Sequence, residues 1–513
     1  MNELLKGLKV ASNMSKTLNG ADTYKSTLNK VYDLFAQGAA MRNANDNDCI
    51  FMFKNAYDED PNLALKCLFY LRDIRGGQGE RRFFRVCLRW LAQAYTAEAE
   101  HLIPYVAEYG RWDDLYTFVD TPAQVAAFNF MKKQLTLDLG SKTPSLLAKW
   151  LKSENASSKE TRLLGYRTRM AFGISSRQYR KALSLLREKI KLVETLMSQN
   201  RWDEIEFDKL PSRAGFIYKN AFARHDITKE RYERFIKDEN TKVNAGTLYP
   251  YDVVHEAAEL FHSRYSWFCS KPDIALDNID RLTINKYWDN LTDYFNEATF
   301  NGLAVVDTSG SMTCGSNIIP IDVAISLGLY CAERAHGPFH NHFISFSRKP
   351  QLIEVEGIDF CDKVHRIYKQ NLCENTNIEA TFDLILNVAR MSHLRQNDLP
   401  ENLIIISDMQ FDEARGEYRY WHSEEDTNVK SMMEKIKSRW EYFGYKMPKL
   451  IFWNVNAVHG NNIPMKDEDG ITYVSGASPV IFEMIMSGKT SQALMLDKLL
   501  SNRYNDITSI RAK

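Results

Sequence analysis

The stretch Leu-Ala-Val-Val-Asp-Thr-Ser-Gly-Ser-Met, residues 303–312, decides the fold. It opens with an apolar run typical of a buried strand, and the run stops at Asp307, where hydroxyls and a glycine favour a sharp turn. Asp307, Ser309 and Ser311 alternate, so a looping backbone can direct one carboxylate and two hydroxyl oxygens toward a single point. Such oxygens suit a small hard cation such as Mg²⁺, so the stretch predicts a metal-binding loop at a strand end.

Two later stretches can supply further oxygens. The apolar run 403–406 reads as a second buried strand, and Ser407 and Asp408 follow it directly. Between the two strands, the polar loop 374–377 opens into an amphipathic run over 378–388, which predicts a helix.

These three loops carry a family resemblance. From about Asn301 onward the chain resembles a von Willebrand factor A domain, whose metal-ion-dependent adhesion site uses Asp-x-Ser-x-Ser, a Thr on a second loop and an Asp on a third. The resemblance implies that Mg²⁺ or Mn²⁺ is held by Asp307, Ser309, Ser311, Thr376 and Asp408. It implies that the hydroxyls bind the ion directly or nearly so and that the carboxylates hold metal-bound waters. Asn377 stands where many such domains carry Asp.

Two other interpretations of residues 303–312 are weaker. An aspartic protease loop would need an uninterrupted Asp-Thr-Gly and a second matching loop to share the proton, and the chain has neither. An N-capping Asp in an ordinary Ser-Gly turn would explain the first loop alone, but not the ordered match of three loops.

Length and composition indicate a folded protein of two domains, or of a large repeat-like array plus a domain. The chain has 513 residues, 44% of them hydrophobic, and its 66 Lys and Arg balance 66 Asp and Glu, so no global charge draws it to nucleic acid or membrane. Eight cysteines are scattered without a Cys-x-x-Cys pair, which favours buried thiols in a reducing compartment. We find no signal-peptide pattern and no apolar run long enough to cross a bilayer, so we expect a cytoplasmic protein with no membrane partner.

The two halves of the chain differ in pattern. Helical spacing predicts helices over 63–71, 82–94, 123–137, 178–197, 213–222 and 253–265. An internal echo, Gly-Arg-Trp-Asp-Asp at 110–114 and Asn-Arg-Trp-Asp-Glu at 200–204, is consistent with stacked helical hairpins of the HEAT-like kind.

Further along, predicted strands at 303–306, 342–346, 403–406, 450–453 and 472–474 alternate with predicted helices at 321–335, 378–392, 429–442 and 480–486, and 352–355 could add an antiparallel edge strand. We therefore predict an α + α/β protein: an all-helical, HEAT-like domain over 1–296, then a doubly wound, mostly parallel sheet of von Willebrand factor A type over 297–513. Ligands of such sheets bind at the carboxyl ends of the strands.

The helical half carries two basic runs. Residues 141–191 hold thirteen Lys and Arg against three Asp and Glu, interleaved with aromatic residues, and 71–90 adds six arginines. Cations among aromatic rings suit single-stranded RNA, although a solvated helix face would show the same pattern. The candidate RNA-binding residues are Arg75, Arg81, Arg82, Lys149, Lys152, Arg162, Arg167, Arg169, Arg177, Arg180 and Lys181. We also expect the glycine turn at 76–79 to let backbone amides approach a phosphate, but it lacks the Gly-Lys-Ser/Thr ending of a nucleotide-hydrolysing loop.

The helical half is similar to a family of phage, bacterial and plant proteins of uncharacterised function. The shared motifs are Leu-Arg-Asp-x-Arg-Gly-Gly-x-Gly-Glu-Arg at 71–81, Gly-Arg-Trp-Asp-Asp-Leu at 110–115 and Lys-Trp-Leu at 149–151. The domain order also resembles the Ro ribonucleoprotein (TROVE) architecture, in which a ring of helical repeats closes on a von Willebrand A domain and binds RNA. That resemblance is one of architecture and transfers no single RNA-contacting residue.

We therefore expect an RNA-binding scaffold that holds single-stranded or structured RNA, or RNA ends, on basic helices, while its metal site engages a carboxylate from a protein partner or from the chain itself. The alternative is a metal-dependent protein-interaction module without a nucleic-acid role. An enzyme is not expected, because no motif positions a nucleophile beside a base. His225 and Asp226 are adjacent, which on a helix points them to different faces, so His225 reads as structural.

Overall fold

The computed structural model describes residues 13–17, 19–263, 266–270, 274–295, 299–313, 318–346, 350–369, 377–411, 432–457, 463–464 and 470–511. Contacts divide the chain into two compact units, which we call the sheet unit (Met1–Asp60 and Leu248–Ser501) and the helical unit (Pro61–Thr247 and Asn502–Lys513). The predicted boundary at 296/297 follows the change of sequence pattern. The structure divides the chain differently: residues 1–60 and 248–296 belong to the unit that contains the sheet, and residues 502–513 belong to the unit of helices.

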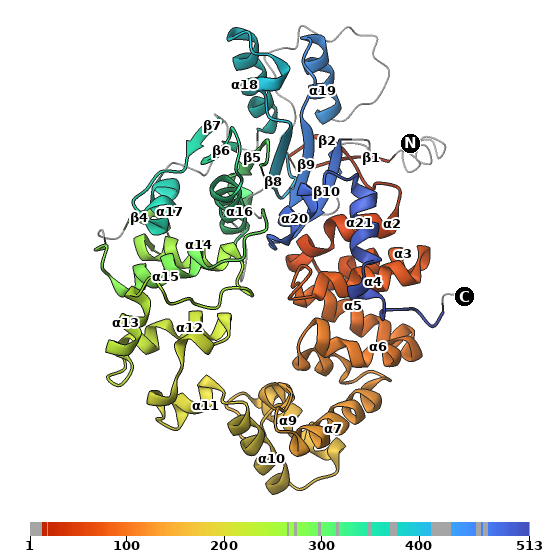
Figure 1. Ribbon diagram of the computed structural model, residues 1–513. Helices are drawn as coiled ribbons and strands as arrows, with labels where there is room; N and C mark the ends of the chain where they lie inside the picture. Colours follow the sequence, from red (N-terminus) through yellow and green to blue (C-terminus); the bar gives the residue numbers. More distant parts are fainter. Residues whose placement is uncertain are drawn as a thin grey trace. The chain divides into compact units, whose positions relative to one another are not determined.

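The sheet unit is built on a six-stranded sheet in the order β10-β9-β8-β5-β6-β7, shown in Figure 1. Its strands are β5 (Gly302–Asp307), β6 (His342–Phe346), β7 (Gln351–Glu354), β8 (Asn402–Ser407), β9 (Lys449–Asn454) and β10 (Ile471–Ser475). Neighbouring strands are parallel except β7, which pairs antiparallel with β6 at the edge. The predicted class, α plus a mostly parallel α/β sheet, is confirmed, and so is the antiparallel edge strand.

The strand order reverses between β5 and β8, and this reversal positions the candidate site. The two strands are parallel and pair Val306 with Ile406, so Asp307 and Ser407 come level at their carboxyl ends. All six residues of β5 are buried. A crevice at such a reversal is where doubly wound sheets bind their ligands.

Helices surround this sheet. In chain order they are α2 (Lys30–Gln37), α3 (Asp46–Glu59), α14 (Pro250–Phe261), α15 (Ile279–Asp289), α16 (Pro320–Arg334), α17 (Phe360–Lys369), α18 (Ile378–Met391), α19 (Met432–Tyr442), α20 (Val480–Met486) and α21 (Ser491–Leu499), with 3₁₀ turns η1 (Gly38–Asn43), η5 (Gly310–Thr313) and η6 (Gln396–Asp398). Helix α16 packs on β5, β6 and β8, and α14 packs on α16 and α17. Helix α14 ends at Phe261, short of the predicted 265, because β3 (His262–Ser263) pairs there with β4 (Ser266–Ser270).

The N-terminal segment joins the sheet unit through two short strands that the sequence did not predict, β1 (Met14–Lys16) and β2 (Asp22–Tyr24). Tyr24 forms an antiparallel bridge with Ile463, and the hydroxyl of Tyr32 on α2 accepts the amide of Tyr473 on β10 at 3.1 Å. The segment therefore lies against the outer strand of the sheet.

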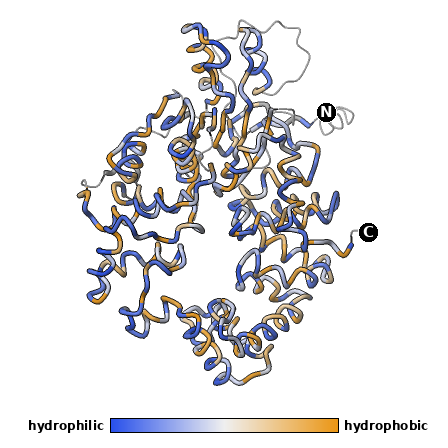
Figure 2. The backbone as a smooth tube through the Cα atoms, in the orientation of Figure 1, coloured by the Kyte–Doolittle hydropathy of each residue, from blue (hydrophilic) through white to orange (hydrophobic). Residues whose placement is uncertain are grey.

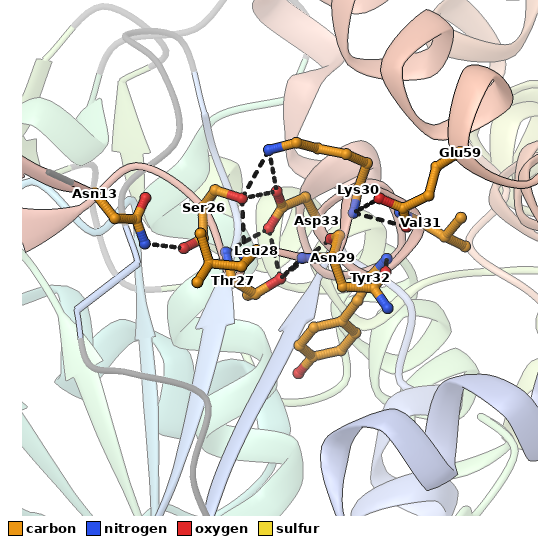
Figure 3. Close-up of polar contacts among 10 residues, drawn as sticks. All are labelled: Asn13, Ser26, Thr27, Leu28, Asn29, Lys30, Val31, Tyr32, Asp33 and Glu59. Carbon is orange, nitrogen blue, oxygen red and sulfur yellow. Dashed lines mark hydrogen bonds and ion pairs between the residues drawn. The ribbon is translucent and has the colours of Figure 1, made fainter. Parts of the chain in front are cut away.

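Polar side chains secure the start of α2, as Figure 3 shows. Asn29 caps the helix by accepting the Tyr32 amide at 2.7 Å, and Glu59 accepts the Lys30 amide. The buried carboxylate of Asp33 accepts the Ser26 hydroxyl at 2.5 Å and both the amide and the hydroxyl of Thr27 at 2.8 Å. These bonds satisfy amides that a helix start leaves without a partner, so the chain entering α2 is tied down.

The helical unit contains α4 (Pro61–Arg72), α5 (Arg81–Ala94), α6 (Thr96–Tyr109), α7 (Gln124–Gly140), α8 (Leu147–Trp150), α9 (Lys159–Phe172), α10 (Ser176–Lys189), α11 (Val193–Ser198), α12 (Ser212–Arg224) and α13 (Lys229–Lys237), with 3₁₀ turns η2 (Trp112–Phe118), η3 (Trp202–Glu204), η4 (Phe207–Lys209) and η8 (Asn502–Tyr504). Figure 2 shows hydrophobic and hydrophilic residues alternating along each of these helices, as expected for helices with one buried face. The predicted helix at 178–197 is interrupted after Lys189, where Lys191 takes a positive φ of 46°.

The internal echo has a structural counterpart. In each copy a tryptophan begins a 3₁₀ turn, and the preceding arginine pairs with an acid inside that turn: Arg111 with Asp113 at 2.8 Å and Arg201 with Glu204 at 2.6 Å. The two stretches therefore share the start of a 3₁₀ turn, although η2 spans seven residues and η3 only three.

The prediction of buried thiols is confirmed for Cys49, Cys67, Cys87, Cys331 and Cys361, which are free and buried. The remaining three cysteines have no described side chain. Among the described residues, no helix combines the length and the apolar character that crossing a bilayer requires.

Candidate metal centre and basic surface

The loop after β5 curls back on its own carboxylate. Asp307 is fully buried, and its Oδ1 accepts the Ser309 amide at 2.9 Å. The curl brings the Oγ atoms of Ser309 and Ser311 to 3.1 Å from each other. Alternate residues of the loop thus present their oxygens on one side, as the sequence pattern predicts.

The loop after β8 meets the first loop through Ser407. Its hydroxyl donates to Asp307 Oδ2 at 2.5 Å and accepts the Met409 amide at 3.0 Å. Met409 has a positive φ of 62°, which turns the chain sharply, and the next amide, of Gln410, donates to Asp408 Oδ1 at 3.1 Å. Two loops about a hundred residues apart are therefore joined by one short hydrogen bond.

The carboxylates of Asp307 and Asp408 repel each other. Burial, followed by the negative charge of Asp408, raises the pKa of Asp307 to about 7. Asp408 is itself only 4% exposed. Two acids confined in this way are costly when both are ionised, and a nearby cation would remove that cost.

These residues fit a small divalent cation. Adjacent ligands of an octahedral Mg²⁺ with bonds of about 2.1 Å lie roughly 3.0 Å apart, close to the separation of the Ser309 and Ser311 hydroxyls. The Thr308 hydroxyl is buried at the same loop without a hydrogen-bond partner among the described residues. Ser311 is exposed, so the loop opens to solvent on its side. The fifth predicted ligand, Thr376, lies outside the described residues.

The structure adds supports that the sequence analysis missed. Besides Ser407, the N-terminal segment holds the Asp408 loop: the Thr17 hydroxyl donates to the Phe411 carbonyl, and the Asn19 side-chain amide donates to the Gln410 carbonyl, both at 2.6 Å. Ser407 could have been suspected from its place beside Asp408. Nothing in the sequence connects residues 17 and 19 with a loop almost 400 residues later.

The predicted RNA-binding cations all lie in the helical unit, and many are held by the protein itself. Arg75 and Arg162 donate to backbone carbonyls, and Lys149, Arg167 and Arg169 pair with Glu194, Asp120 and Glu154. Lys152 Nζ lies 5.5 Å from the centre of the Tyr116 ring, and the Arg82 amide donates to Glu80.

Four of these cations remain available. Arg81, Arg177, Arg180 and Lys181 are exposed, and their side chains form no ion pair or hydrogen bond within the part of the chain that the structure describes. Arg177, Arg180 and Lys181 share α10, where three- and four-residue spacing places them on one side of the helix.

The expectation of a phosphate-cradling turn at 76–79 is wrong. The amides of Gln78, Gly79 and Glu80 donate to the carbonyls of Tyr70, Asp73 and Leu71, so they are used within the fold. A Cβ at Gly77 would lie 2.0 Å from the Tyr70 carbonyl oxygen. Gly77 therefore serves close packing of this turn against α4.

His225, which the sequence analysis considered as a possible base, packs against an aromatic ring. The His225 ring stacks on Trp202, with ring centres 3.8 Å apart. In the described part of the chain, no group of three or more His, Cys, Asp or Glu side chains could hold a metal ion.

Comparisons with known proteins give two family models. One, described as Domain of unknown function (DUF2828), matches residues 17–125 and 141–299, just over half of the chain. The other, described as Domain of unknown function (DUF7788), matches residues 301–506.

Two individual proteins are also similar. A protein of Acanthamoeba polyphaga mimivirus, described as uncharacterized, is 29% identical over 524 residues, covering 93% of this chain and 85% of that protein. Among solved structures, the Ro (RSR) protein of Deinococcus radiodurans aligns with 92% of this chain and 96% of its own, at 13% identity and a TM-score of 0.36.

Proposed function

We propose, for a chain that belongs to the family described as Domain of unknown function (DUF2828), that it is an RNA-binding scaffold whose helical unit holds single-stranded RNA or RNA ends. The sheet unit would hold Mg²⁺ or Mn²⁺ at Asp307, Ser309, Ser311, Thr376 and Asp408 and present it to a carboxylate.

The observation that carries the proposal is the exposed basic side of α10. Arg177, Arg180 and Lys181 are solvent-facing cations, and no acid lies in the first turn of the helix. On α9, Tyr166 is 49% exposed and the Arg169 guanidinium lies 5.0 Å from its ring centre. Phosphates meet such cations and bases stack on such rings, which together favour a single strand.

Binding of a single-stranded oligoribonucleotide tests the proposal. We expect the purified, nucleic-acid-free protein to bind it with a steep salt dependence, and the double variant Arg177→Glu, Arg180→Glu to bind at least roughly tenfold more weakly. Its slope of log K against log salt should fall by about 1.4, for two lost phosphate contacts. Fluorescence anisotropy from 50 to 300 mM salt measures both.

The matched control is Lys229→Glu, a charge reversal at another exposed position of the helical unit. It should leave affinity and slope near wild type. Absence of binding at low salt, or equal weakening by all charge reversals, would overturn the proposed function.

Metal binding is tested separately by thermal unfolding. Mg²⁺ at one hundred times its dissociation constant should stabilise the protein by about 2.7 kcal/mol. We expect Ser311→Ala to reduce this stabilisation strongly, because it removes an exposed hydroxyl of the loop, whereas Ser392→Ala, at another exposed serine of the sheet unit, should keep it. Equal Mg²⁺ stabilisation of both variants would argue against the site.

A metal-dependent protein-interaction module without a nucleic-acid role is the second candidate. It is favoured by the exposure of Ser311 beside the buried Asp307 and Ser309, which leaves one side of the site accessible to a partner's carboxylate. Capture of acidic peptides that EDTA abolishes, together with no RNA binding, would select it over the scaffold.

A further inference from the structure

Three sequence motifs far apart in the chain meet in the helical unit. The motif at 71–81 ends with Arg81, the first residue of α5; that at 110–115 enters η2; and Trp150 of the third ends α8. Both α5 and α8 pack on η2. The exposed basic side of α10 does not explain why these three motifs come together.

Two aspartates of η2 bind three arginines. Asp114, buried with no exposed surface, accepts Arg72 Nε at 2.8 Å and Arg85 Nε at 2.6 Å. Asp113 pairs with Arg85 Nη2 at 3.0 Å and with Arg111 Nη2 at 2.8 Å. Although burial raises it, the bonds and charges of Arg111 and Arg85 hold the pKa of Asp113 below its ordinary value.

A fourth arginine makes the cluster positive. Partial burial, then the charges of Arg111 and Arg85, lowers the pKa of Arg81, although that side chain has no ion pair among the described residues. Four arginines beside two aspartates leave a formal excess of two positive charges. Repulsion between them is a cost that an anion would offset.

The cluster also occupies an unfavourable place for cations. Arg81 lies in the first turn of α5, which contains no acidic residue, and the positive end of a helix dipole disfavours cations there. Glu80 already caps this end of the helix by accepting the Arg82 amide at 3.0 Å, so an anion bound here would be held by the arginine side chains and not by the helix amides.

The arginine side chains are held in place. Arg85 Nη2 is buried and forms its ion pair with Asp113 at 3.0 Å. The Arg111 guanidinium lies 4.0 Å from the centre of the Trp150 ring, which fixes its plane. Guanidinium forks fixed in this way match the oxygens of a phosphate.

We propose that Arg81, Arg85 and Arg111 form a binding site for a phosphate monoester, as carried by the 5′ end of an RNA strand or by a free nucleoside monophosphate. A monoester carries a charge near −2 at neutral pH, which balances the excess of the cluster, whereas an internal phosphodiester carries −1. In its RNA form, this inference rests on the proposed function.

The test compares one oligoribonucleotide with a 5′-phosphate and with a 5′-hydroxyl. We expect the wild-type protein to prefer the phosphorylated strand by roughly tenfold or more, and Arg81→Glu to remove the preference. Arg81 is exposed, so this variant should fold, which circular dichroism checks. Lys133→Glu, at an exposed position of α7, should keep the preference.

The same binding experiment distinguishes a failure of the proposed RNA binding from a failure of the proposed phosphate site. Arg177→Glu with Arg180→Glu should weaken both strands together and leave their ratio unchanged. If the wild type binds both strands equally, the RNA form of the inference is overturned while RNA binding stands; if neither strand binds, the proposed function falls.

Adenosine 5′-monophosphate separates the two sources of the phosphate. A rise in the unfolding temperature of the wild type with the nucleotide, but not with adenosine and not in Arg81→Glu, supports the site even if no RNA binds. No such rise, together with equal binding of the two strands, would reject the site altogether.

Discussion

Asp114→Ala is expected to destabilise the helical unit by about 3–5 kcal/mol, the usual cost of removing one partner from a buried ion pair. The Asp114 carboxylate is fully buried and accepts Arg72, Arg85 and the Arg111 amide, the last at 2.9 Å. Arg72 is only 1% exposed, so without Asp114 its charge would remain buried and uncompensated. A loss of this size is a large fraction of the roughly 5–15 kcal/mol by which a typical native protein is stable.

Gly110 shows how closely this pair is packed. A Cβ at residue 110 would lie 2.4 Å from Asp114 Oδ2 and 2.9 Å from Arg72 Nε. Only glycine leaves room for the pair, so Gly110→Ala should destabilise in the same direction as Asp114→Ala.

Denaturant unfolding followed by tryptophan fluorescence measures this loss, since Trp112 lies in the same 3₁₀ turn as Asp114. The matched control is Asp120→Ala, which removes the ion pair of an exposed aspartate with Arg167 and should change stability little. A loss below about 1 kcal/mol for Asp114→Ala would show that the cluster is not what holds the unit together.

Truncation after Ser501 is expected to be comparably damaging to the helical unit. The removed residues include Tyr504 and Ile507, both fully buried, and Tyr504 stacks on Tyr109 with ring centres 5.6 Å apart. Truncation would also strip the buried Asp73 of its ion pair with Arg503 and of the Tyr504 hydroxyl bond at 3.0 Å.

Point variants give this second prediction its controls. Tyr504→Ala should reproduce much of the loss, about 3–5 kcal/mol for a large buried aromatic side chain. Thr508→Ala, at an exposed position of the same segment, should be close to neutral. Limited proteolysis measures the destabilisation as faster cleavage within residues 61–247 of the truncated protein than of the full chain. Equal protection of the two proteins would contradict the prediction.

Local sequence determined the helices and strands of this protein, because apolar runs and amphipathic spacing are patterns of residues close together in the chain. The apolar run before Asp307 became β5, the run before Asp408 became β8, and amphipathic spacing located α5, α7 and α12 to within a few residues. Alternation of strands and helices sufficed to predict the parallel sheet, and parallel pairing places the carboxyl ends of β5 and β8 at the same edge.

Only the tertiary structure decided which side chains are available and what holds them. Arg167 and Arg177 look equivalent in sequence, yet a distant aspartate, Asp120, pairs with the first and not with the second. The support of the Asp408 loop by Thr17, and the return of Arg503 to Asp73, join residues about 400 positions apart. Such contacts depend on how the whole chain packs, and no local pattern of charge or hydropathy encodes them.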